Sequence, residues 1–75
     1  MTHYERSSSA QSRLDLWLWV ARFYKTRNVA VANIKKGLVR LHGKTTTKPA
    51  SLLTVGSQLV IEQNFVRKTV SVEEI

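Results

Sequence analysis

The sequence predicts an α+β fold in which two N-terminal helices pack on a small, mainly antiparallel sheet of three to five strands. Apolar residues recur with helical spacing before Gly37 and with a period of two after it. Turn signals then divide the second half of the chain into short apolar runs. Because no helix is predicted between these runs, their strands should pair antiparallel.

Length and N-terminal composition predict one folded unit. A chain of 75 residues is enough for one small domain with a modest core. Residues 1–11 are polar and contain three consecutive serines. We therefore expect a disordered tail over residues 1–11 and a single domain over residues 12–75.

The first helix should begin at Ser12 and end near Tyr24. The Ser12 hydroxyl can accept a hydrogen bond from the Asp15 amide, and the Asp15 carboxylate suits the positive end of the helix dipole. One apolar stripe should face the core, and it consists of Leu14, Trp17, Leu18 and Ala21. A second apolar face consists of Leu16, Trp19, Val20 and Phe23. A helix that is apolar on both sides is buried on both or offers one side to a partner.

The second helix and the strands follow from local signals. Thr26 can cap a helix over residues 27–36, which Gly37 ends. A strand is expected over residues 38–42, followed by a turn at His42 and Gly43 and a polar loop over residues 44–49. After a turn at Gly56, "QLVIE" and "VRKTVSV" read as two strands joined through residues 63–65.

The charge of the chain is strongly positive and unevenly placed. Twelve Lys and Arg residues oppose five Asp and Glu residues, which gives a net charge of +7. No acidic residue lies between Asp15 and Glu62. That interval holds Arg22, Lys25, Arg27, Lys35, Lys36, Arg40, Lys44 and Lys48. Such self-repulsion opposes folding, and it indicates a polyanionic partner.

Residue types for catalysis or metal binding are missing. The chain has no cysteine, and its two histidines are His3 in the expected tail and His42 in a turn. Zinc-ligand spacing and a phosphate-binding glycine loop are also absent. We therefore expect no enzyme activity, no metal and no cofactor. The sequence has neither an apolar run of about 18 residues nor a signal-peptide core, so we expect a cytoplasmic protein without membrane contact.

The junction between the two helices is the candidate binding site. Lys25 and Arg27 flank Thr26, where unpaired backbone amides and the helix dipole favour an anion such as phosphate. No acidic residue is near them in sequence. Further bases could extend this surface into a strip that fits a nucleic-acid backbone, namely Arg40, Lys44 and Lys48, with Arg13 and Arg22 beyond them.

A longer pattern supports this interpretation. The stretch "RLDLWLWVARFYKTRNVAVANIKKGLVRLHG", followed by "KP", resembles the S4-type RNA-binding domain, also called the alpha-L motif, and above all its ribosome-associated heat-shock members. The resemblance implies non-catalytic binding of structured RNA, chiefly ribosomal or transfer RNA, on the large ribosomal subunit. It also implies an RNA surface of Arg13, Lys25, Thr26, Arg27, Arg40, Gly43, Lys44 and Lys48, with Thr26 and Gly43 shaping the backbone. We expect a monomer.

Two other functions fit the same residues. The Leu16, Trp19, Val20 and Phe23 face could dock a protein partner, in which case the charge would be secondary. Alternatively, the chain could be a targeting domain of a larger RNA-modifying enzyme, because this fold often occurs as an appendage.

Overall fold

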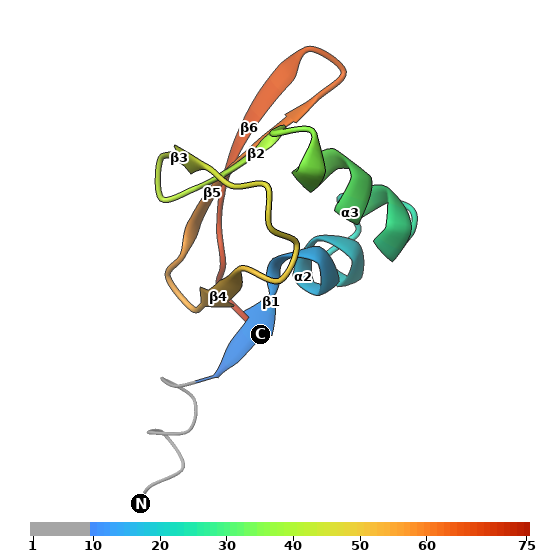
Figure 1. Ribbon diagram of the computed structural model, residues 1–75. Coiled ribbons are helices and arrows are strands. Elements are labelled where there is room, and N and C mark those ends of the chain that lie inside the picture. The colour runs from blue at the N-terminus through green and yellow to red at the C-terminus, as the bar shows by residue number, and fades with distance from the viewer. Residues whose placement is uncertain (1–9) are drawn as a thin grey trace, which may run out of the picture.

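Two helices lie on one side of a set of antiparallel strands in the computed structural model, which describes residues 10–75 (Figure 1). The helices are α2 (Leu14–Val20) and α3 (Arg27–Lys35). This arrangement confirms the predicted α+β class.

The main sheet has four strands, all antiparallel to their neighbours. Its strands are β2 (Val39–Leu41), β3 (Lys44–Thr45), β5 (Gln58–Gln63) and β6 (Val66–Ser71), in the order β3-β2-β5-β6. Val39 lies opposite Ile61 and Leu41 lies opposite Leu59, so one face of the sheet carries apolar side chains toward the helices. The β2–β3 turn has positive φ at both His42 and Gly43, as the turn signal predicted.

A second, two-stranded sheet was not predicted. Strand β1 (Gln11–Arg13) pairs antiparallel with β4 (Leu52–Thr54), and Gln11 lies opposite Thr54. Gln11 is therefore in a strand, although the tail was expected to include it. Residues 1–9 of the expected tail lie outside the described part of the chain.

The start of α2 differs from the expected Ser12 cap. The Ser12 hydroxyl donates to the Arg13 carbonyl at 3.2 Å and does not accept from the Asp15 amide. Backbone carbonyls from the loop before β4 take that place: the Leu14 amide donates to Ser51 at 2.8 Å, and the Asp15 amide donates to Pro49 at 3.2 Å. The helix start is thus capped by a distant segment and not by its own side chain.

The end of α2 comes at Val20, four residues before the predicted end. Arg22 has a φ of +67°, and the helix closes with two hydrogen bonds, Arg22 amide to Trp19 carbonyl at 2.9 Å and Phe23 amide to Leu18 carbonyl at 3.0 Å. This is a Schellman motif with arginine where glycine is usual. The apolar pattern continues through Phe23 because that residue folds back onto the core, although it is no longer helical.

The boundaries of α3 were predicted correctly to within one residue. The Thr26 hydroxyl accepts from the Val29 amide at 3.1 Å, which confirms the cap. Gly37 has a φ of +81°, and the Leu38 amide donates to the Asn33 carbonyl at 3.2 Å, so α3 also ends in a Schellman motif. Between helices and sheet lies a core of Leu14, Leu18, Tyr24, Ala30, Ile34, Val39, Leu53, Leu59, Ile61 and Val72.

Candidate nucleic-acid interface

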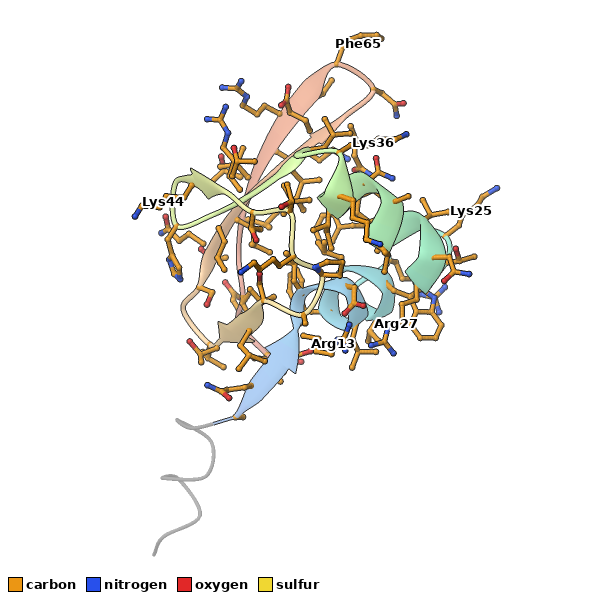
Figure 2. The ribbon with its side chains drawn as sticks, in the orientation of Figure 1. Arg13, Lys25, Arg27, Lys36, Lys44 and Phe65 are labelled. Atoms are coloured by element: carbon orange, nitrogen blue, oxygen red, sulfur yellow. The ribbon has the colours of Figure 1, made fainter. Side chains whose placement is uncertain are left out.

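Two arginines from separate elements meet at one carboxylate near the start of α3 (Figure 2). Arg13 donates from Nε and Nη2 to the two Asp15 oxygens at 3.1 and 3.0 Å. Arg27 donates from Nε to Asp15 Oδ2 at 3.3 Å. β1 places Arg13 and the capped first turn of α3 places Arg27, while Asp15 comes from the first turn of α2.

Asp15 is almost fully buried and remains ionised. Its side chain is 2% exposed, and the Leu16 amide donates to Oδ1 at 2.8 Å. Burial by itself raises the pKa of a carboxyl group, but hydrogen bonds from Arg13, Arg27 and the Leu16 amide, with the charge of Arg27, outweigh it and lower the pKa of Asp15. Asp15 therefore accepts from two cations, and its carboxylate also lies in the first turn of α2, as the sequence predicted.

This cluster corrects the expectation that the junction cations have no acidic partner. Arg27 is twelve residues from Asp15 in sequence but bonded to it in the fold. Two guanidinium groups share one carboxylate, so the cluster keeps one net positive charge. The side chains of Arg13 and Arg27 are 48% and 40% exposed, which leaves donors on both facing solvent. An anion can therefore still bind there.

Lys25 and Thr26 have different roles at the junction. The Thr26 hydroxyl is used in capping α3. Lys25 is exposed and points away from the Arg13 and Arg27 side chains (Figure 2). It belongs instead to a surface groove of about 620 Å³ that the α2–α3 connection forms, with lining residues Trp19, Val20, Arg22, Phe23, Tyr24 and Lys25. Arg22 thus lies with Lys25, beside a half-exposed indole.

The remaining predicted site residues are spread over the sheet side of the molecule. Lys48 lies in the loop whose carbonyls cap α2, so this loop contacts the helix that carries Asp15. Arg40 lies opposite Val60 and Thr45, on the sheet face away from the core. Gly43 lies in the β2–β3 turn, and Lys44, the first residue of β3, lies across the molecule from Lys25 (Figure 2). The structure thus brings Arg13 together with Arg27 and Arg22 together with Lys25, and it separates Arg40 and Lys44 from both pairs.

The second apolar face of the first helix is only partly free. Trp19 and Val20 are 42% and 65% exposed. Leu16 is half-buried, and Phe23 stacks on Trp17 with ring centroids 5.8 Å apart. Trp17 also donates from its indole to the Glu74 carbonyl at 3.0 Å, which ties the C-terminal end of the chain to α2.

Sequence reasoning missed the basic residues of the β5–β6 hairpin. Arg67 and Lys68 are exposed on β6, and Lys68 Nζ donates to Gln63 Oε1 at 3.3 Å. The Gln63 amide group donates in turn to the Phe23 carbonyl at 2.7 Å. A side-chain hydrogen bond across 40 residues connects this hairpin to the helix junction, and local sequence patterns do not report such contacts.

Within residues 10–75, no group of three or more His, Cys, Asp and Glu residues is placed to hold a metal ion. None of the helices in that part of the chain has the length and apolar character needed to cross a membrane.

The fold and the exposed cations define a class: a small basic α+β domain with guanidinium and ammonium groups on its surface. Residues 12–59 match the S4 domain model, and the chain belongs to the S4 domain family. It is therefore an RNA-binding domain, as the resemblance implied.

Its relatives include heat-shock proteins. It is 39% identical to Heat shock protein 15 of Escherichia coli (strain K12) over 67 residues, which cover 89% of this chain and 50% of that protein. It is 40% identical to a Heat shock protein 15 homolog of Haemophilus influenzae over 60 residues, which cover 80% of this chain and 45% of the homolog. The trimeric structure of Vibrio cholerae Heat Shock Protein 15 matches with a TM-score of 0.81 and 39% identity, over 88% of this chain and 66% of that chain. The chain spans about half the length of the curated relatives it matches.

Proposed function

We propose that the chain binds structured ribosomal RNA without catalysis, in a ribosome-associated or heat-shock role on the large subunit. The observation that carries the proposal is the pair of half-exposed arginines aligned by buried Asp15 at the start of α3, within an S4 domain. Similarity to Heat shock protein 15 supports the heat-shock role. The cytoplasm is the proposed location.

Phosphate contacts would supply most of the affinity. Arg13 and Arg27 each have guanidinium donors left for a phosphate oxygen, and Lys25 and Arg22 offer charge along the adjoining groove. Because cations on a folded surface recognise the spacing of phosphates, selectivity should follow RNA shape more than base sequence. We propose that Arg40, Lys44 and Lys48 make a separate contact with the same RNA on the sheet side, and that Thr26 and Gly43 fix backbone conformation.

A filter-binding titration of purified large-subunit ribosomal RNA across salt concentrations tests the proposal. If about five phosphates are neutralised, log K falls against log salt with a slope of roughly −3.5 to −4.5. Lys25→Ala should weaken binding and reduce that slope by about 0.7 to 0.9. Lys35→Ala, in the last turn of α3, is the matched control and should change neither. A flat salt response, or equal effects of the two variants, contradicts the proposed surface.

A protein partner is the second candidate, and the exposure of Trp19 and Val20 favours it. Trp19 emission that responds to ribosomal protein but not to RNA would support this candidate.

We propose a monomer, whereas the Vibrio cholerae relative is trimeric. Sedimentation velocity of this chain decides between the monomer and the trimer.

A targeting domain of a larger enzyme is another alternative. A longer parent reading frame that encodes an RNA-modifying domain would show that the chain serves as such a targeting domain.

A further inference from the structure

The β5–β6 hairpin ends in a turn whose second residue is poorly suited to its backbone. Gln63 lies opposite Val66, so the turn consists of Asn64 and Phe65 alone, with φ angles of +52° and +64°. A two-residue turn with both φ positive is type I′, which favours asparagine first and glycine second. Asn64 fits this preference. Phe65 does not, because its Cβ is crowded in the left-handed region.

The Phe65 side chain does not stabilise the fold either. Its relative exposure is 108%, so the ring contacts no core residue and stands at the tip of the hairpin (Figure 2). The left-handed backbone at Phe65 is unfavourable for folding, and the exposed ring offers no burial to offset it. The fold itself therefore gives no reason for a phenylalanine at this position.

On β5, Glu62 lies opposite Arg67, so two cations and one acidic residue lie near the hairpin tip at Phe65. Val66, Arg67 and Lys68 follow it and are all exposed, and neither cation forms an ion pair within residues 10–75. The hairpin is held against the α2–α3 connection, since Lys68 donates to Gln63 and Gln63 donates to the Phe23 carbonyl. The groove of Arg22 and Lys25 begins at that connection. These hydrogen bonds link Lys68 to the connection that carries Arg22 and Lys25.

We infer that Phe65 stacks on an unpaired base of the bound RNA while Arg67 and Lys68 contact neighbouring phosphates. This inference rests on the proposed RNA binding and adds a second contact, distinct from the Arg13 and Arg27 cluster. A single ring followed by two cations suits a base with phosphates next to it, and it is too small an apolar area for a stable protein interface. The base must be unpaired, because bases within a duplex are already stacked on each other.

The substitution Phe65→Gly gives effects of opposite sign on stability and binding. Glycine relieves the left-handed strain, so the melting temperature should rise by about 2 to 8 °C. Loss of the ring should weaken binding to a stem-loop RNA with an unpaired loop by roughly 5- to 150-fold. Binding to a blunt duplex of the same stem should change by less than about twofold.

Further variants separate stacking from general apolar contact. Phe65→Tyr should keep stem-loop affinity within about twofold, while Phe65→Leu should lose nearly as much as glycine, because leucine has no aromatic face. With 2-aminopurine in the loop, wild type should quench its fluorescence and Phe65→Gly should not. Val55→Ala is the position control, since Val55 is 52% exposed beside Gly56 at another turn, and it should change none of these readings.

The outcomes separate this inference from the proposed function. If wild type binds the stem-loop and Phe65→Gly binds it equally well, the hairpin inference is wrong while RNA binding stands. Affinity retained by Phe65→Leu, or lost equally for the duplex, also overturns base stacking. Loss of ribosome association with free-RNA binding intact would assign the tip to a ribosomal protein instead. If wild type binds no RNA at any salt concentration, both proposals fail.

Discussion

Replacing Asp15 with asparagine should destabilise the domain at neutral pH. The change keeps the shape of the side chain but removes the charge that receives three hydrogen bonds from Arg13 and Arg27. A hydrogen bond to a charged group contributes about 1 kcal/mol more than a neutral one, which suggests about 3 kcal/mol for three bonds. Solvent screening of the half-exposed guanidinium groups reduces this to about 2 kcal/mol.

A loss of this size is easily measured in a small domain. At about 4 to 8 °C per kcal/mol, the melting temperature of Asp15→Asn should fall by about 8 to 16 °C. Urea unfolding followed by tryptophan emission gives the free energy directly. Glu73→Gln is the matched control, because it removes the same charge from an exposed position and should change stability by less than about 0.5 kcal/mol.

The pH dependence of the difference in unfolding free energy between wild type and Asp15→Asn shows whether the Asp15 charge causes it. The pKa of Asp15 is lower in the folded state than its ordinary value of 3.8, so its ionised form stabilises the fold above that value. This contribution is lost as the pH falls through the lower, folded-state pKa. The free-energy gap between wild type and Asp15→Asn should therefore be full at pH 7 and shrink below about pH 4. A gap that is absent at neutral pH, or constant down to pH 2, refutes the assignment.

Three other substitutions test local features of the fold. Arg22→Gly should stabilise the domain by about 1 kcal/mol in urea unfolding, because the φ of +67° strains a residue with a Cβ. A destabilised variant would show that the backbone at Arg22 is not strained. Thr26→Ala should cost about 1 kcal/mol by removing the α3 cap, and circular dichroism should show lost helix; Thr26→Ser should retain most of the stability. Tyr24→Phe should raise the unfolding free energy by about 1 kcal/mol, because the buried hydroxyl has no partner within residues 10–75, and burial raises its pKa. An unchanged or lower free energy would indicate a bound water at that hydroxyl.

Sequence patterns predicted the elements whose signals are local. α3 was found because its cap and its terminal glycine lie within a few residues of it. The end of α2 was missed because Arg22 occupies the left-handed position that Gly37 occupies in α3. β1 was missed because its three residues have no apolar alternation and their partner strand is β4, far along the chain.

For the candidate site, too, composition and motif were informative, whereas contacts between distant segments could not be predicted. Composition indicated a polyanion-binding surface, and the resemblance named the right family. The pairing of Arg27 with Asp15 could not be read from spacing, because it depends on how the two helices pack. The Gln63 contact with the Phe23 carbonyl likewise joins segments that only the folded chain brings together.

The carbonyls of Pro49 and Ser51 that cap α2 give the domain an unusual order of assembly. With seven residues, α2 is too short to persist alone in water, and its acceptors are about 35 residues downstream. During synthesis, α2 cannot gain these hydrogen bonds until the loop before β4 has left the ribosome. The helix that carries Asp15 is therefore completed only after residues 49–51 are translated, and the arginine pair is assembled no earlier.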